Sequence, residues 1–278
     1  MDLYLAGGIS GNLKPIWTDL CKNKYCGGVD AIDLYLAGGQ GERRRVEAET
    51  IEKLDVAILE SFYYVDDWII QLIPKLSKFL LDSGAFTFMT SHKGTVDWND
   101  YLKRYADFIN KHDIKLFFEL DIDSIVGYEK VLEMRKWLEN ATGKKPIPVW
   151  HKSRGRTEFL KMCDEYDYVA IGGIVSKEIR PPDYKYFPWF INEAHKRGAK
   201  IHGLGFTNLE GVTKYHFDSV DSTSWTTGNR FGAIYRFNGK TMEKFDKKEG
   251  QQLKDSRAVA VNNFNEWVKF QYYARTNL

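Results

Sequence analysis

Short apolar runs alternate along the chain with longer stretches in which apolar residues recur every three or four positions. The short runs predict strands over 34–37, 56–59, 79–82, 116–121, 147–151, 168–172, 200–205 and 217–221. The longer stretches predict helices, most clearly over 98–112, 127–140 and 187–198. Strands that alternate with helices in this way are parallel and joined by crossover helices, and uninterrupted apolar strands are typical of a sheet covered on both faces.

Roughly eight strand–helix units predict an α/β fold of the (β/α)8 barrel type, with a doubly wound open sheet as the alternative. Polar residues follow several of the predicted strands: Asp82, Asp121 with Asp123, His151 and Asp221. In a barrel these strand ends meet at one mouth, where the active sites of this fold lie, and this favours the barrel. Within "FLLDSGAFTF" (79–88), Asp82 would then open into the pocket, and Gly84 would let the backbone turn.

Both ends of the chain carry a further pattern. After Arg230, "FGAIYRFNGKTMEKF" alternates around the turn signal Asn238-Gly239, and a long helix is predicted over 253–274. We expect this hairpin and helix, 231–278, to cap a single barrel domain that spans 1–278.

The segment "DLYLAGG" occurs at Asp2–Gly8 and again at Asp33–Gly39. We expect the second copy to form the first barrel strand, which makes 1–32 a partly duplicated N-terminal extension.

Composition excludes few functions. The chain has 278 residues, of which 43% are apolar and 28% charged, and its net charge is only +2, as in many soluble globular proteins. No apolar run reaches the roughly 18 residues of a membrane helix, and the start lacks the layout of a signal peptide, so we expect a cytoplasmic protein without membrane contact. Cys21, Cys26 and Cys163 form neither a disulfide framework nor a zinc finger pattern.

Two acidic segments have the residue types of a reactive site. "FFELDIDSIVG" places Asp121 and Asp123 on the same side of a strand end, and "FDSVDSTSW" offers Asp218 and Asp221 among hydroxyl residues. Such carboxylates hold a divalent cation, act as nucleophile or general acid–base, or accept hydrogen bonds from a polar ligand. The alternative is structural, because Asp123 stands where a helix N-cap is expected.

The segment 78–230 resembles the tRNA-guanine transglycosylases and their relatives that insert 7-deazaguanine bases into DNA. "LLDSGAF" is similar to the D-S-G-G-F motif of that family, and "ELDID" stands where the family carries a base-reading aspartate. "AIGGIV" (170–175) and "HGLGFT" (202–207) are similar to its G-G-L-A stretch and base-packing strand. "SVDSTSW" (219–225) is similar to F-D-S-A-S-Y, which carries the nucleophile. With "ILESFYY" ahead of "LLDSGAF", the layout resembles phage-encoded proteins of the group.

The resemblance implies replacement of guanine in a polynucleotide by a 7-deazaguanine through a covalent aspartyl-sugar intermediate, without metal or cofactor, in the host cytoplasm if the protein is phage-encoded. Asp221 would be the nucleophile and Asp82 the general acid–base. The expected base contacts are Ser83, Phe86, Asp121, Asp123, His151, Gly172, Gly173, Ile174 and Leu204. The expected phosphate contacts, from basic clusters, are Arg43, Arg44, Arg45, Lys152, Arg154 and Arg156.

The sequence departs from this family in three places. No cysteine follows Cys163, so we expect no zinc subdomain, and we expect no C-terminal RNA-binding domain. "VWHKSRG" replaces the family's Gln-Gly-Gly, so that His151 or Trp150 would take its place. These departures favour DNA over tRNA as the substrate. The alternatives are a nucleoside glycosidase or deoxyribosyltransferase, a non-catalytic nucleic-acid-binding barrel, and a metal-dependent hydrolase. The entering base, the target sequence and assembly as a homodimer stay open.

Overall fold

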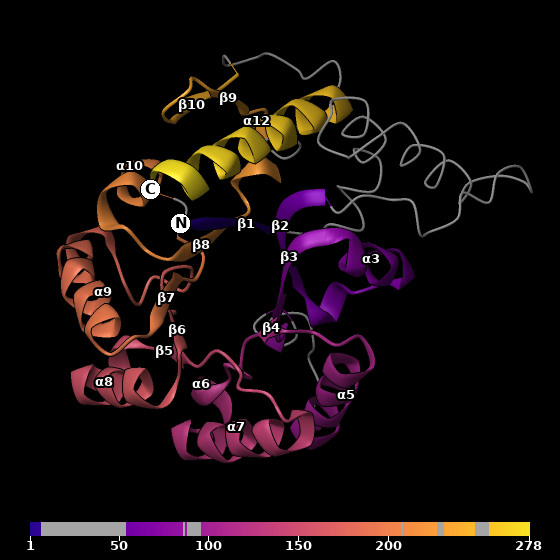
Figure 1. The fold of residues 1–278 in the computed structure, drawn as a ribbon, viewed down its shortest axis with the longest axis vertical. Coiled ribbons are helices and arrows are strands. Elements are labelled where there is room, and N and C mark those ends of the chain that lie inside the picture. The colour runs from indigo at the N-terminus through magenta and orange to yellow at the C-terminus, as the bar shows by residue number, and fades with distance from the viewer. Residues whose placement is uncertain (7–53, 86, 88–95, 207, 227–230, 248–255) are drawn as a thin grey trace, which may run out of the picture.

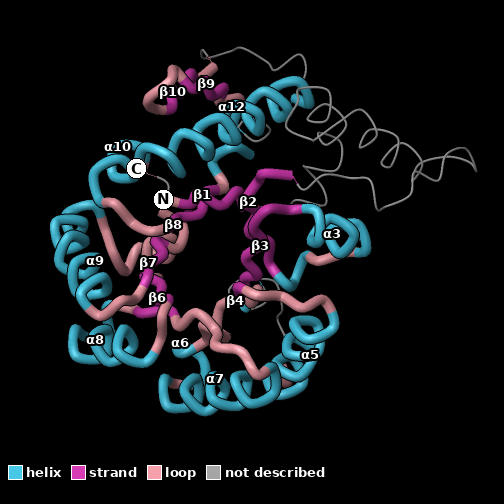
Figure 2. The backbone as a smooth tube through the Cα atoms, viewed as in Figure 1, coloured by secondary structure: helices cyan, strands magenta, loops and turns pink. Residues whose placement is uncertain are grey.

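Eight parallel strands form the centre of the molecule. A computed structural model of the chain describes residues 1–6, 54–85, 87, 96–206, 208–226, 231–247 and 256–278. The strands are β1 Asp2–Ala6, β2 Leu54–Ser61, β3 Leu76–Asp82, β4 Leu116–Phe117, β5 Val149–Trp150, β6 Tyr168–Ile171, β7 Lys200–Gly203 and β8 Ser219–Ser222. They pair in the order β4-β3-β2-β1-β8-β7-β6-β5. A parallel bridge between Phe118 and Ile147 joins the two edges, and the sheet curls into the predicted barrel (Figure 2).

Helices surround this barrel (Figure 1). They are α3 Asp67–Leu72, α5 Trp98–Lys111, α6 Asp123–Val126, α7 Tyr128–Thr142, α8 Gly155–Glu165, α9 Phe187–Lys196, α10 Leu209–Tyr215 and α12 Ser256–Asn277, with 3-10 turns at Phe62–Tyr64, Ile73–Lys75, Lys152–Arg154, Pro181–Tyr186 and Ser224–Thr226. The helices predicted over 98–112, 127–140 and 187–198 are confirmed. Asp97 caps α5 by accepting hydrogen bonds from the backbone N–H groups of Asn99 and Asp100, which explains where this helix begins.

The first copy of the repeated segment forms the first strand, and our choice of the second copy was wrong. β1 lies between β2 and β8, with Tyr4 opposite Asp221 and Leu5 opposite Ile58. The second copy, at 33–39, lies outside the described residues. Helix α12 covers β1 and β2 through the buried Gln271, whose amide donates to the carbonyls of Leu3 and Ala57 and accepts from the Ala57 N–H. A side chain of the last helix thus completes hydrogen bonds of the first two strands.

Side chains of the strands alternate between the outside and the inside of the barrel. Leu3, Ile58 and Val220 point outward and pack under the helices. Tyr4, Ala57, Leu80, Phe118, Val149 and Ala170 point inward and fill the barrel. Because the side-chain period of a strand is two, the next inward positions after Leu80, Val149 and Ser219 are Asp82, His151 and Asp221. The inward row therefore changes from apolar to ionisable at the carboxyl end of the barrel.

The C-terminal cap is confirmed. β9 Ile234–Phe237 pairs in antiparallel fashion with β10 Met242–Phe245 around Asn238 and Gly239, which has φ +96°. The side chain of Asn263 in α12 accepts a hydrogen bond of 2.8 Å from the Tyr235 N–H and fixes the hairpin to the helix. No helix among the described residues is both long and apolar enough to cross a bilayer.

Candidate active site

A cavity of about 290 Å³ opens at the carboxyl ends of the barrel strands. It is lined by Ala6, Leu59, Glu60, Ser61, Tyr64, Asp82, Thr87, Asp121, His151, Gly173, Val175, Ser176, Leu204, Gly205, Asp221 and Thr223. The fold thus brings together four ionisable residues that the sequence predicted at strand ends: Asp82, Asp121, His151 and Asp221. This is the mouth at which barrel enzymes place their reacting groups.

Asp82 is held in place by the turn that follows it. Its Oδ2 accepts a hydrogen bond of 3.0 Å from the Gly84 N–H. Gly84 has φ +73°, and a Cβ there would lie 2.7 Å from the Ser61 Oγ and 2.8 Å from the Tyr63 backbone nitrogen. Only glycine therefore fits, because both the backbone conformation and the space exclude a side chain. The buried phenol of Tyr101 also donates to the carbonyl of Ser83 over 2.6 Å.

The surroundings of Asp82 disfavour its charged form. Burial, with a smaller contribution from the nearby carboxylates of Asp221 and Asp121, outweighs the hydrogen bond from the Gly84 N–H and raises the pKa of this carboxyl to about 6. A group with such a pKa can both release and accept a proton close to neutral pH. The influence of Asp221 and Asp121 also means that the three carboxylates share one electrostatic environment.

Asp221 is the second carboxylate of the cavity and is only 6% exposed. Its Oδ1 accepts hydrogen bonds from the Gly205 N–H and from His202 Nε2, the latter at 3.2 Å. Within the described residues Oδ2 has no hydrogen-bond partner. Asp218, three residues earlier, is instead bound to His195 Nε2 and the Ile201 N–H, each at 2.8 Å, and does not line the cavity. Of the two aspartates in "FDSVDSTSW", Asp221 is therefore the one in the site.

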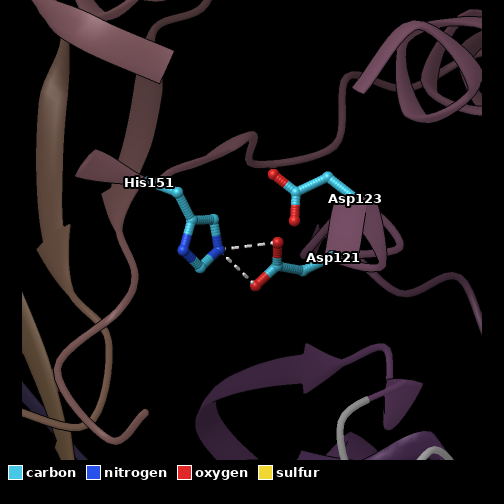
Figure 3. Close-up of side chains that lie close together, drawn as sticks. All are labelled: Asp121, Asp123 and His151. Atoms are coloured by element: carbon cyan, nitrogen blue, oxygen red, sulfur yellow. Dashed lines mark hydrogen bonds and ion pairs between the residues drawn. The ribbon is translucent and has the colours of Figure 1, made fainter. Parts of the chain in front are cut away.

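Asp121 faces His151 across the mouth, as Figure 3 shows. The two Asp121 carboxylate oxygens lie 2.8 and 2.9 Å from His151 Nε2, and Glu178 Oε2 lies 2.8 Å from Nδ1. Burial lowers the pKa of His151, but the hydrogen bond and charge of Asp121 and the hydrogen bond of Glu178 outweigh it and raise the pKa to about 9. At neutral pH the ring is an imidazolium that donates to a carboxylate from each nitrogen.

Arg154 and Asp123 do not have the roles predicted for them. The side chain of Arg154 is 2% exposed and donates to Asp123 Oδ2 from Nη2 at 3.0 Å and to Glu119 Oε1 from Nη1 at 3.4 Å. It is therefore not available to phosphate. Asp123 neither lines the cavity nor caps α6, where Ile122 holds the N-cap position without a side-chain hydrogen bond. Its carboxylate holds Arg154, so we no longer expect it to contact a base.

We call the ionic cluster where β4 meets β5, made of Glu119, Asp121, Asp123, Arg135, His151 and Arg154, the seam; within the described residues it also holds a group of donor atoms that could bind a metal ion. Asp121, Asp123 and His151 each offer one ligand atom within 4.8 Å of the others (Figure 3). Carboxylates and imidazole are ligands for divalent cations. Each donor is already used, however: His151 Nε2 by Asp121, and Asp123 by Arg154. A cation would have to displace both interactions, so these side chains satisfy one another in the structure.

The remaining predicted contacts divide into three groups. Leu204 and Gly173 line the cavity, whereas Ser83, Gly172 and Ile174 do not. Gly172 instead makes room for His151, because a Cβ there would lie 3.0 Å from the imidazole. Lys152 and Arg156 are exposed but do not line the cavity: Lys152 pairs with Asp183 at 3.3 Å, and Arg156 stacks over Trp189. Phe86, Arg43, Arg44 and Arg45 lie outside the described residues.

Sequence reasoning missed three residues of the site. Glu60 directly follows the apolar run of β2, one residue before the strand ends at Ser61, and it lines the cavity while being 1% exposed. The rule that selected polar strand ends would have found it in "ILESFYY". Glu178 lies in the loop after β6 and reaches His151 only through the fold. His202 could have been noticed from its position, because it lies between Ile201 and Gly203 in the predicted strand 200–205 and is fully buried.

Comparisons with known proteins add little to this site. No protein-family model matches the sequence, and no curated protein matches it. A solved structure, that of the carboxyl transferase domain from Rhizobium etli pyruvate carboxylase with pyruvate, matches over 80% of this chain and 41% of that chain, with 12% identity and a TM-score of 0.41. Likeness at that level carries no argument about function. The barrel rests on its own strand pairing.

Proposed function

We propose that this protein is a base-exchanging glycosyltransferase that replaces guanine in a polynucleotide, DNA rather than tRNA, with a 7-deazaguanine. The observation that carries the proposal is the pair Asp82 and Asp221, two carboxylates in one cavity with different surroundings. Asp82 is desolvated and exchanges a proton near neutral pH, whereas Asp221 is fixed through one oxygen by two donors. Environments that separate two carboxyl groups in this way assign them different roles in acid–base and glycosyl chemistry.

In the first half of the reaction, protonated Asp82 gives its proton to the leaving guanine. The bond between C1′ and the base breaks as an oxygen of Asp221 forms a bond to C1′. The product is an aspartyl-sugar ester, and Asp82 is left as a carboxylate. The oxocarbenium-like transition state gains from the negative charge that Asp221 brings to the ring.

The second half reverses these steps with another base. The entering 7-deazaguanine loses a proton to Asp82 and attacks C1′, and the Asp221 carboxylate departs. Two displacements on opposite sides retain the configuration of the sugar. The base would be read by the Asp121 carboxylate, which accepts hydrogen bonds, and would pack against Leu204. A target inside a duplex must first leave the base stack.

Lys152 and Arg156 are the described cations on which we base the polynucleotide part of the proposal. Both side chains are exposed and line a second pocket together with Trp150 and Asp183; Lys152 directly follows His151 in sequence, and Arg156 lies in α8. Phosphate contacts of this kind would make binding fall steeply with salt concentration. Free nucleosides, which lack these phosphates, would bind without that dependence.

The test is to incubate the protein with labelled DNA or tRNA and a 7-deazaguanine, and to separate the products on a denaturing gel. We expect a slow-migrating covalent adduct with DNA. The adduct should disappear in Asp221→Ala, a loss on the order of 10⁴-fold or more in rate. Asp218→Asn is the matched control, because it lies on the same strand segment outside the cavity and should still form the adduct.

Other outcomes would contradict the proposal in different ways. An adduct that depends on Asp218 would mean that the nucleophile is wrongly assigned. Turnover of free nucleosides without any adduct on oligonucleotides would favour a glycosidase or deoxyribosyltransferase. Salt-sensitive binding with no turnover of any substrate would favour a non-catalytic nucleic-acid-binding barrel.

A further inference from the structure

The interior of the barrel contains a chain of polar side chains directly below Asp221. His202 is fully buried, and its ring packs against Phe118 and Tyr4, with ring centroids 5.3 and 6.1 Å away. Its Nε2 lies 3.2 Å from Asp221 Oδ1, and its Nδ1 lies 2.5 Å from the Ser219 Oγ. The Ser219 Oγ is also hydrogen-bonded to the phenol of Tyr168. Four side chains from β6, β7 and β8 are thus linked in one row.

One arrangement of hydrogens satisfies every member of this row without an extra charge. Burial raises the pKa of Tyr168, so its phenol keeps its proton and donates to Ser219. The Ser219 hydroxyl then donates to His202 Nδ1, and the ring carries its hydrogen on Nε2, facing the carboxylate. With the hydrogen on Nδ1 instead, a lone pair of Nε2 would face the lone pairs of Asp221 Oδ1, and this buried ring nitrogen would have no donor.

We propose that His202, set in its Nε2–H tautomer by Ser219 and Tyr168, is a positioning residue that holds Asp221 with Oδ2 directed at the sugar. This inference rests on the proposed function, in which Asp221 is the nucleophile. Hydrogen bonds from His202 and Gly205 to Oδ1 stop the carboxylate from rotating, and a displacement of about 1 Å at a reacting atom can cost on the order of 100-fold in rate. The same donors stabilise the carboxylate when it departs in the second step.

The first experiment tests the network without any substrate. Nitrogen-15 NMR of histidine-labelled protein distinguishes the two neutral tautomers and the imidazolium, and His202→Gln identifies the signal of residue 202 among the six histidines. We expect the Nε2–H tautomer in the wild type and a mixture of tautomers in Ser219→Ala. An imidazolium, or a hydrogen on Nδ1, in the wild type would overturn the inference.

The second experiment measures the rate of adduct formation and the affinity for DNA separately. Ser219→Ala should form the adduct about tenfold more slowly, and His202→Phe about 100-fold more slowly, with unchanged DNA affinity. His202→Gln should keep most of the rate, because its amide always carries N–H donors. For the same reason, adding Ser219→Ala to His202→Gln should have no further effect, which a double-mutant cycle measures.

The outcomes separate this inference from the proposed function. If the wild type forms no adduct, the proposed function fails and the NMR result alone decides whether the tautomer is set as described. If the wild type forms the adduct through Asp221 but Ser219→Ala and His202→Phe react as fast, the inference fails and the function stands. Thermal unfolding of each variant shows whether it is folded, and a rate loss that parallels lost folded protein would also count against the inference.

Discussion

The carboxylates on the two sides of the cavity mouth differ in whether a cationic side chain pairs with them. On the β4 and β5 side, Glu119, Asp121 and Asp123 are matched by Arg135, His151 and Arg154. On the β3 and β8 side, Asp82 and Asp221 face the cavity, and within the described residues neither pairs with a lysine or arginine. Both sides are largely buried, so burial alone does not explain the difference.

On the β4 and β5 side, the paired carboxylate of Glu119 makes a hydrogen bond that the short strands do not make with each other. β4 and β5 are two residues long, and Glu119 Oε1 accepts from the Val149 N–H at 2.7 Å where the barrel closes. Uncompensated charges on the second side have no such structural benefit and cost free energy. A buried carboxyl group with a strongly shifted pKa in a cavity is typical of a functional site, which points to Asp82. Asp221 lines the same cavity and accepts hydrogen bonds there through only one of its oxygens.

The largest effect that would test this contrast is expected at Arg135. Its Nε donates to Glu119 Oε2 at 2.6 Å, and the two side chains are 3% and 0% exposed. Arg135→Met should lower the free energy of unfolding by about 3 kcal/mol, because it leaves part of a buried charge uncompensated. Urea unfolding measures this loss.

The matched control for Arg135 is Arg104→Met. Arg104 pairs with Asp100 at 2.9 Å, but the two side chains are 56% and 60% exposed. We expect a change below about 0.5 kcal/mol, because water screens this pair. Equal losses in the two variants would mean that the charge pair at the seam does not carry the stability assigned to it.

The next largest effect concerns Asp82 and has the opposite sign. The pKa of Asp82 is about 6 in the folded state against an ordinary value of 3.8, so ionisation of this group destabilises the fold as pH rises from about 4 to 6. Asp82→Asn should therefore be more stable than the wild type at pH 7 by about 2–3 kcal/mol and equally stable near pH 3.5. A stability difference that does not change with pH would contradict the assigned ionisation.

His151 should show the reverse pH dependence. Its folded pKa of about 9 lies above the ordinary value of 6.5, so the interactions with Asp121 and Glu178 stabilise the fold fully below pH 6.5 and are lost as pH rises through 9. His151→Gln should cost about 2 kcal/mol at pH 6 and much less at pH 9.5. Urea unfolding at both pH values measures this cost, and a cost that is larger at pH 9.5 than at pH 6 would contradict the prediction.

The contrast also explains what the sequence could predict. The barrel and the positions of Asp82, His151 and Asp221 followed from apolar runs and from the polar residue after each run, which depend on local spacing. The choice between the two identical copies of "DLYLAGG" depended on packing against β8 and α12, and no local signal separates them.

The roles of charged residues depended on partners distant in sequence. Arg154 belongs to a basic cluster that is typical of an exposed face, yet its side chain is buried and donates hydrogen bonds to Glu119 and Asp123. The contact between Glu178 and His151 could not be predicted from the sequence, because it forms only when the loop after β6 folds beside His151. Residue type and spacing therefore predicted which groups are at the mouth, whereas the fold decided which of them are neutralised.

Chelation should produce the smallest effect and sharpens the contrast at the seam. The donors of Asp121, Asp123 and His151 could form a cation site, and a metal-dependent hydrolase would need one. His151 and Arg154 already supply positive charge to these carboxylates. We therefore expect EDTA to leave the free energy of unfolding unchanged within about 0.5 kcal/mol and to leave the rate of adduct formation unchanged. Loss of activity in EDTA that Mg²⁺, Mn²⁺ or Zn²⁺ restores would show that a cation displaces the His151 and Arg154 contacts. The seam would then belong to the reacting side of the mouth, and the division between compensated and reactive carboxylates would be wrong.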